Sequence, residues 1–301
     1  MLRNVNVYYL AYLSIGVIWG TNFLFMKWAA EWITPLQIVF LRVAAGFVPV
    51  FLYALYKGQF NLAHLKNIHH FFIMSFLATT IYYYCFAKGT ALLESGIAGA
   101  LSGSIPIFSA IATFVLLKEE KITRKAVVGI GIGLMGVIII ARPWESGAAG
   151  LDISGIFYML VGSLSIGVSF VYARKYITPM NIPPAVLTSY QMLIAMIAIG
   201  FFGDLQGIEN IQSDGVALIG VLVGLGLLGT GLAYILYYVI VKHLGAVVAS
   251  TATYIPPVVS LLIGAFLANE LILLSDWGAM LLILSGVFVM NKKSGEKKMI
   301  N

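Results

Sequence analysis

Long apolar stretches recur along the whole chain and are separated by short polar connections. An α-helix needs about 20 apolar residues to cross the hydrocarbon core of a membrane, so the pattern predicts an all-α membrane protein with ten transmembrane helices. The longest polar connection, 57–70, is expected to be a loop. The expected spans are 7–26, 35–56, 71–87, 95–117, 126–141, 153–173, 182–203, 215–241, 244–269 and 275–291.

The composition agrees with a chain that is surrounded mainly by a lipid bilayer. Of the 301 residues, 60% are hydrophobic and 10% are charged, whereas soluble domains carry about 25% charged residues. The net charge of +6 comes from basic residues spread over short loops, so nucleic acid is not expected as a partner. Cys85 is the only cysteine, which excludes intrachain disulfides and cysteine-rich metal sites. We expect neither a metal nor a cofactor.

The basic residues are distributed unequally between the two sides of the membrane that ten spans define. If the N-terminus is inside, fourteen of the 18 basic residues lie in inner segments and three in outer segments. Loops rich in Lys and Arg stay in the cytoplasm, so both termini are expected there. The basic segment 292–301 is expected to be a cytoplasmic tail, and the compact chain is typical of a prokaryotic inner-membrane protein.

The two halves of the chain show internal similarity when the sequence is shifted by 150 residues. Five spans per half is an odd number, so the second half must enter the membrane from the opposite side. We therefore expect two inverted five-helix repeats, 1–141 and 151–291, around a central cavity. The aligned pairs include Thr80 and Thr230, Tyr84 and Tyr234, Ile105 and Ile255, Pro106 and Pro256, and Glu120 and Glu270.

Short motifs within these repeats resemble the drug/metabolite transporter superfamily, in particular its ten-helix EamA-type members. The motifs are Trp19-Gly20-Thr21-Asn22-Phe23, Leu41-Arg42, Ser104-Ile105-Pro106 and Tyr254-Ile255-Pro256, and an acidic residue, Glu120 or Glu270, follows each proline motif. The resemblance implies a cavity between the halves and export of amino acids or related metabolites. The second half carries Ile166-Gly167-Val168-Ser169-Phe170 in place of the tryptophan motif, so the halves need not contact the substrate equally.

Pro106 and Pro256 lie near the centres of their expected spans. A proline inside a helix removes one hydrogen bond and crowds the carbonyl four residues earlier. Carbonyls freed in this way need partners, which favours a position facing protein or a water-filled cavity. We expect these prolines to act as hinges, and a structural kink shared by both copies is the alternative.

Arg42 is the only charged residue deep inside an expected span. A charge there is costly unless it is paired or hydrated, so its side chain should face the interior. The planar guanidinium suits a substrate carboxylate or phosphate. The alternative is a structural role in which Arg42 anchors helix packing through backbone carbonyls.

Tyrosines cluster in the third and eighth spans, where Thr80 and Tyr84 share a helix face, as do Thr230 and Tyr234. Amphipathic rings suit a pocket for an organic molecule with apolar and polar parts, and the aromatic belt at a membrane interface is the alternative. The predicted substrate-binding residues are Trp19, Asn22, Arg42, Tyr83, Tyr84, Ser104, Tyr234, Tyr238 and Tyr254.

Four glycines, Gly129, Gly131, Gly133 and Gly136, crowd the fifth span. They lie in an apolar helix rather than a phosphate-binding loop, and small residues there favour close helix packing or a homodimer.

The leading hypothesis is a secondary transporter or facilitator that moves a small organic metabolite by alternating access. A nucleotide-sugar or sugar-phosphate carrier of the same superfamily is the nearest alternative, and it would need more basic residues in the cavity than Arg42. An intramembrane enzyme with Ser104 as nucleophile lacks a histidine base within any expected span, so no catalytic residue is expected. A receptor or scaffold that transports nothing is a further alternative.

Overall fold

The computed structural model describes residues 2–117, 123–142, 144, 152–245, 249 and 251–291. Glu120 and the expected tail, 292–301, lie outside these described residues. All regular elements within the described part of the chain are helices. Eight helical runs are long and apolar enough to cross a membrane, and two shorter apolar ones, Ala252–Phe266 and Leu274–Met290, bring the described set to ten. The prediction of a ten-helix, all-α membrane protein is therefore confirmed.

The helices of the first half follow one another with short connections. They are α1 (Leu2–Ala30), α2 (Pro35–Tyr56), η1 (Leu62–Asn67), α3 (Ile68–Ser75), η2 (Phe76–Ile81), α4 (Tyr82–Leu92), α5 (Ser95–Ser102), α6 (Ile105–Leu116) and α7 (Arg124–Ala141).

The second half repeats this order. Its elements are α8 (Ile153–Tyr172), η3 (Ala173–Ile177), η4 (Thr178–Met180), α9 (Pro184–Phe202), η5 (Ile208–Ser213), α10 (Gly215–Ile219), η6 (Gly220–Leu232), α11 (Ala233–Leu244), η7 (Ala252–Tyr254), α13 (Ile255–Phe266) and α14 (Leu274–Asn291).

The connection 57–70, expected to be a loop, is largely helical, and this expectation was wrong. The Asn61 side chain accepts a hydrogen bond from the backbone N–H of Ala63 and starts the 3-10 helix η1. This helix leads directly into α3, so the third span begins well before residue 71. The polar side chains here do not end the helix: His69 is exposed, and His70 forms a hydrogen bond between its Nδ1 and the Tyr172 hydroxyl at 2.6 Å.

Polar side chains mark where several helices begin. Thr34 and Gln37 form a capping box at the start of α2, in which each side chain accepts a hydrogen bond from the other residue's backbone N–H. Asp152 accepts from two backbone N–H groups at the start of α8, and Asp214 does the same at α10. Such caps satisfy N–H groups that the helix itself leaves unpaired.

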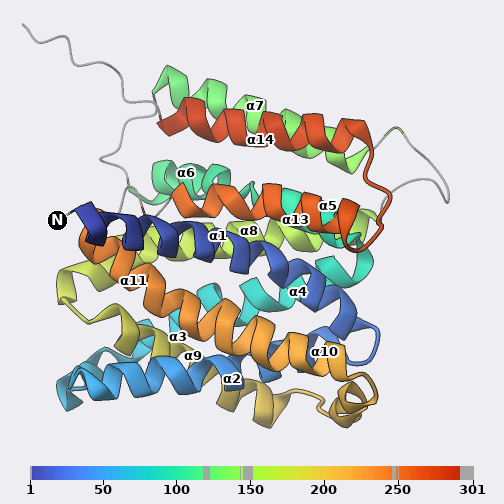
Figure 1. The fold of residues 1–301 in the computed structure, drawn as a ribbon. Coiled ribbons are helices and arrows are strands. Elements are labelled where there is room, and N and C mark those ends of the chain that lie inside the picture. The colour runs from blue at the N-terminus through green and yellow to red at the C-terminus, as the bar shows by residue number, and fades with distance from the viewer. Residues whose placement is uncertain are drawn as a thin grey trace, which may run out of the picture.

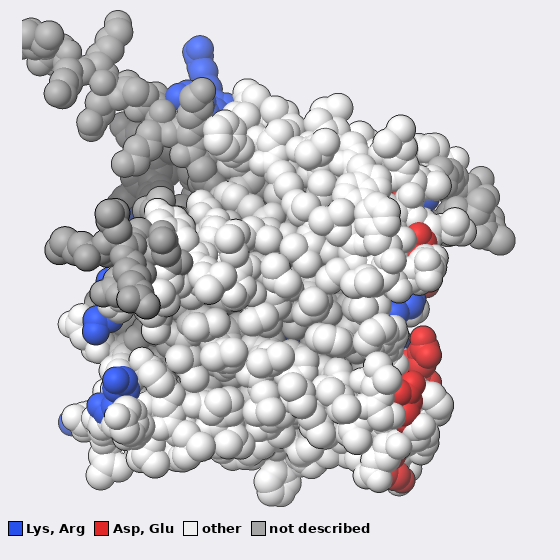
Figure 2. Space-filling view, viewed as in Figure 1, with Lys and Arg blue, Asp and Glu red and all other residues white. Residues whose placement is uncertain are grey.

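Charged side chains separate toward opposite ends of the helices. Figure 2 shows Lys and Arg mainly at one end of the drawn face and Asp and Glu at the other. We refer to these as the basic end and the acidic end. Described connections at the basic end carry Lys57, Lys66, Lys175 and Lys242, and those at the acidic end carry Glu31, Glu94, Asp204, Asp214 and Glu270.

The two halves are inverted relative to one another. The chain enters α1 from the basic end, where the N-terminus lies (Figure 1). It enters α8, the corresponding helix of the second half, from Asp152 at the acidic end. The structure thus has the inverted-repeat architecture that an odd number of spans per half requires.

Helices α7 and α14 form a separate outer layer and pack mainly against each other (Figure 1). Glycines let their backbones touch: a Cβ added at Gly286 would lie 2.4 Å from the carbonyl oxygen of Gly129 and 2.6 Å from the nitrogen of Gly133. Gly136 contacts α14 in the same way, whereas Gly131 has open space around it. The packing role predicted for the glycines of this helix therefore applies to all except Gly131.

A buried ion pair closes the acidic end of this layer. Arg142 follows α7 and reaches Asp276 in the first turn of α14, with 2.5 Å between Nη2 and Oδ1. The second carboxylate oxygen of Asp276 accepts the backbone N–H of Leu273 at 2.9 Å. The local sequence around Arg142 does not indicate this pair, because the partner lies 134 residues away.

The glycine contacts predict that α7–α14 packing has little tolerance for a methyl group. Replacing Gly286 with Ala pushes a Cβ into backbone atoms of α7, and we expect this to lower the free energy of unfolding by about 1–3 kcal/mol. Gly131→Ala is the matched control, since it meets no atom within 4 Å and should leave stability unchanged or slightly raised. Equilibrium unfolding in mixed micelles measures both, and equal stability of the two variants would contradict this packing.

Candidate functional site

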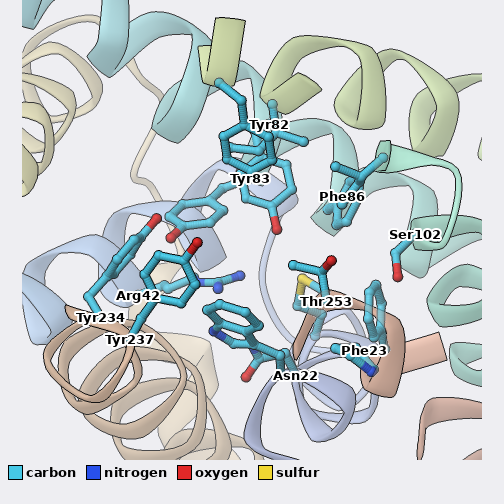
Figure 3. Close-up of a pocket in the computed structure, with 16 residues that line it drawn as sticks. Asn22, Phe23, Arg42, Tyr82, Tyr83, Phe86, Ser102, Tyr234, Tyr237 and Thr253 are labelled. Atoms are coloured by element: carbon cyan, nitrogen blue, oxygen red, sulfur yellow. The ribbon is translucent and has the colours of Figure 1, made fainter. Parts of the chain in front are cut away.

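A cavity of about 140 Å³ lies at the interface of the two halves. Its walls come from α1, α2, α4, α5 and α6 of the first half and from α8, α11, η7 and α13 of the second. Figure 3 shows the lining side chains around the cavity. The lining residues are Trp19, Asn22, Phe23, Met26, Arg42, Tyr82, Tyr83, Phe86, Ser102, Ile105, Ile166, Phe170, Tyr234, Tyr237, Thr253 and Pro256.

Two interrupted helices meet this cavity. In the first half, α5 ends at Ser102 and α6 begins at Ile105, with Pro106 in its first turn. In the second half, Pro256 lies in the first turn of α13, directly after the 3-10 turn η7. Both spans are therefore interrupted at the proline, as the sequence predicts. The hinge role of these prolines stays a prediction. Each begins a new helix, where the missing N–H costs no hydrogen bond.

π-helical turns occur at corresponding places of the two halves, directly before α4 and α11. The segment η2 of the first half and η6 of the second are both π-helical and include the aligned Thr80 and Thr230. The Thr230 hydroxyl donates to the carbonyl of Leu225, five residues earlier, at 2.9 Å. Such turns are rare and often occur at functional sites. Here one of them carries the hydroxyl that contacts Arg42.

Arg42 reaches the cavity from α2 and is 5% exposed. Its Nε donates to the Thr230 hydroxyl at 3.0 Å, and its guanidinium carbon lies 3.8 Å from the ring centroid of Tyr83. Figure 3 shows the terminal nitrogens directed toward the centre of the cavity. Among the described residues these nitrogens have no hydrogen-bond or carboxylate partner, and no acidic side chain lines the cavity.

The positive charge of Arg42 is only partly compensated by its surroundings in the protein interior. The Tyr83 ring provides a cation–π contact, and Thr230 satisfies one of five donors. A buried charge is costly unless it is paired. The arrangement therefore provides a ready site for an anionic group or for water in the cavity.

Trp19 and Asn22 fix α1 against η6 beside Arg42. Trp19 donates its indole N–H to the carbonyl of Gly229 at 3.2 Å. The Asn22 side chain also packs on Gly229, where an added Cβ would lie 2.3 Å from its Oδ1. This oxygen is buried and has no hydrogen-bond partner within the described structure. A buried amide group in that state is costly, so Asn22 adds a second incompletely satisfied polar residue to the lining.

Several lining residues were absent from the sequence prediction. Phe23 and Met26 share a helix face with Trp19 and Asn22 at spacings of three and four residues, so helical periodicity could have found them. The same spacings occur on two other helices of the lining. Phe86 follows Tyr83 by three residues and Tyr82 by four, and Tyr237 follows Tyr234 by three. The proline motif and the segment aligned with the tryptophan motif already contained Ile105, Ile166 and Phe170. No comparable signal identifies Ser102 or Thr253, because their positions depend on how the halves pack.

Five predicted site residues lie outside the lining. Tyr84 is one position from Tyr83, so its ring points away and meets Tyr158 edge-on at 6.3 Å. The Ser104 hydroxyl donates to the carbonyl of Leu101 at 2.7 Å. Tyr238 hydrogen-bonds Thr188, and Tyr254 packs on the core. Neither of these tyrosines lines the cavity, and the same is true of Pro106.

Buried side chains enclose the cavity toward the acidic end. Lining residues on the acidic side are almost fully buried, with Phe23 at 4%, Met26 at 1% and Phe86 at 3% exposure. Phe170, close to the end of α8 that leads to Lys175, is 47% exposed. Among the described residues, the lining is therefore most deeply buried on its acidic side.

Two inverted helical halves around a polar-centred cavity define a membrane transport protein, because this architecture places one site where two halves can expose it alternately. The chain belongs to the EamA-like transporter family, which it matches over residues 6–142 and 153–292. The resemblance to drug/metabolite transporters is thereby confirmed.

Related proteins agree with this assignment. An uncharacterized transporter of Archaeoglobus fulgidus is 28% identical over 276 residues, which cover 91% of this chain and 95% of the relative. YdfC of Bacillus subtilis, also described as an uncharacterized transporter, is 28% identical over 86% of this chain and 82% of its own length. YedA of Escherichia coli K12, described as an uncharacterized inner membrane transporter, is 23% identical over 92% of this chain and 88% of its own.

A solved crystal structure shares the fold. It aligns with a TM-score of 0.62 over 95% of this chain and 96% of its own, at 17% sequence identity.

The Arg42–Thr230 contact predicts a specific cost when the hydroxyl is lost. Thr230→Val keeps the shape of the side chain but leaves the buried Nε without its acceptor. We expect the free energy of unfolding to fall by about 1–3 kcal/mol. Thr80→Val is the matched control, since Thr80 occupies the aligned position in η2 and forms no side-chain hydrogen bond in the described structure. If both variants unfold alike in mixed micelles, Thr230 does not hold Arg42.

Proposed function

We propose that this protein is a secondary transporter or facilitator that exports a small organic metabolite, an amino acid or related compound, by alternating access. The observation that carries the proposal is the guanidinium of Arg42 in a cavity between inverted halves, with terminal nitrogens that have no hydrogen-bond partner among the described residues. The family supports transport as the activity. The substrate class rests on the chemistry of the cavity.

Arg42 gives the substrate a carboxylate anchor. A guanidinium presents two parallel N–H donors to a carboxylate, and Tyr83 stacks on the Arg42 plane and limits its orientation. The remaining wall is mainly aromatic and aliphatic, which suits an apolar side chain. A carboxylic acid with an apolar body matches both parts.

The cavity volume limits the size of the substrate. A cavity of roughly 150 Å³ accommodates benzene in another protein, and the present cavity is about 140 Å³. A small amino acid is close to this size. A nucleotide sugar is much larger, and its phosphates would face one lining cation, Arg42, within the described structure. The phosphorylated-substrate alternative is therefore not favoured.

The charge distribution supports an export direction. Basic connections mark the cytoplasmic side of a membrane protein, so we assign the basic end and both termini to the cytoplasm. The lining residues on the acidic side are almost fully buried, so the proposed entry of a cytoplasmic metabolite to Arg42 is from the basic end. We further assign the protein to a prokaryotic inner membrane, the location that the description of YedA gives for that relative.

Flux from proteoliposomes tests the proposal directly. The protein is reconstituted with a labelled panel of amino acids, nucleosides and cationic drugs, with and without a pH gradient. We expect protein-dependent release of small amino acids, and acceleration by the gradient would add proton coupling. Release of cationic drugs alone, or no flux from verified folded protein, would contradict the proposal.

Arg42→Gln separates anchoring from folding in the same assay. Two analogues of the transported amino acid serve as matched competitors. One is the carboxylic acid that lacks the amino group, and the other is the amine that lacks the carboxylate. We expect the acid to compete better than the amine, and Arg42→Gln to lower transport at least tenfold because a charge-assisted pair is lost. The control is Lys57→Gln, which removes an exposed charge at the basic end. Normal transport by a folded Arg42→Gln protein would leave Arg42 a structural role.

A further inference from the structure

Glu270 links the two halves at the acidic end. It follows α13, and its Oε1 accepts the backbone N–H of Ser95 at 2.8 Å. Its Oε2 accepts the N–H of Gly96, also at 2.8 Å. Ser95 and Gly96 are the first residues of α5, the helix that ends beside the cavity at Ser102. One side chain of the second half therefore holds the start of a cavity-lining helix of the first.

The first N–H groups of a helix have no partner within it and carry a partial positive charge. Glu94 occupies the cap position of α5, but its side chain makes no capping hydrogen bond. The carboxylate of Glu270 takes that role from the other half of the protein. Ionised acceptors form the stronger class of hydrogen bond, so this contact favours the arrangement in which α5 and α13 lie together.

The surrounding backbone is shaped to admit the Glu270 carboxylate. A Cβ added at Gly264 would lie 2.3 Å from Oε2 and 3.0 Å from the Cα of Gly96. A second close contact joins Gly99 of α5 to Ser260 of α13. These small residues let the two helices meet without a gap, directly on the acidic side of the closed cavity.

Other charged groups at this end have partners of their own. Lys27 donates to the carbonyl of Leu93 at 2.6 Å, and Asp276 pairs with Arg142. No cation lies within ion-pair distance of Glu270 in the described part of the chain. The contact between Glu270 and α5 is thus a carboxylate-to-backbone bond that a movement of either helix would break.

We propose that Glu270 is the gate residue of the acidic end: its bond to α5 holds the cavity closed there, and release of this bond opens the cavity to that side. This inference rests on the proposed transport by alternating access. Two hydrogen bonds from one side chain can form and break as a unit when α5 and α13 separate. Because these bonds join the two halves, we expect them to be present when the halves are closed at this end and absent when the halves are open there.

Cysteine accessibility tests the gate without knowledge of the substrate. Cys85 is the only cysteine, so Cys85→Ala with Ser102→Cys places one thiol in the cavity wall. An anionic, membrane-impermeant methanethiosulfonate is applied to intact cells and to inverted vesicles, which expose opposite sides. We expect labelling of the parent to be slow from the acidic end. Adding Glu270→Gln should raise the acidic-end labelling rate about tenfold or more, since it removes a charge-assisted bond.

Glu94→Gln is the matched control, because it removes a neighbouring carboxylate that makes no cap bond, and it should label like the parent. Gly264→Ala displaces the carboxylate by another route, and it keeps the test available if Glu270→Gln does not fold. An unchanged acidic-end rate in whichever of these two variants is folded would overturn the proposal and leave Glu270 a helix cap. Because labelling needs no substrate, failure of the flux assay would not alter this result.

Discussion

Hydrocarbon offers no hydrogen-bond partners, so every backbone N–H and C=O of a membrane-spanning chain must be satisfied within the protein or at a water-filled cavity. This constraint explains why the described regular structure is entirely helical. It also explains where helices can break. The interruptions between Ser102 and Ile105 and around η7 occur at the interface of the halves, where a cavity and packed protein surround them.

The same constraint applies to the charged side chain of Arg42. A cation in the interior requires compensation, yet the structure supplies one hydroxyl, one aromatic face and a cavity. The closed acidic end shows the opposite solution, since Glu270, Lys27 and Asp276 are each bonded within the protein. These three side chains at the acidic end are thus bonded within the protein in this conformation, whereas the guanidinium at the centre keeps donors for a molecule that enters.

Much of the fold could be predicted from the sequence because hydrophobic length and the number of spans per half are local properties of the chain. Sequence motifs, the cost of burying Arg42 and the tyrosine clusters also indicated a site that includes Trp19, Asn22, Arg42, Tyr83 and Tyr234, and the structure brings these five together in one lining. Periodicity could not distinguish a proline that kinks a helix from one that starts a new helix. Both patterns place Pro106 in the middle of one apolar stretch, and only the turn at Gly103 and Ser104 separates them.

The missed features depend on contacts between distant parts of the chain. Tyr84 and Tyr83 are equally good candidates by composition, and the rotation of α4 in the packed structure decides which one lines the cavity. The pairs Arg142–Asp276 and Glu270–Ser95 join residues 134 and 175 positions apart. No local pattern indicates such pairs. The repeat did align Glu270 with Glu120, but it gave no partner for either residue.

The most direct test of a carboxylate site at Arg42 is an experimental structure of the protein with a transported acid bound. We predict that the carboxylate oxygens lie within about 2.7–2.9 Å of the terminal nitrogens of Arg42, while Nε keeps its bond to Thr230. A substrate bound elsewhere in the protein, with these nitrogens still facing only water, would contradict the account.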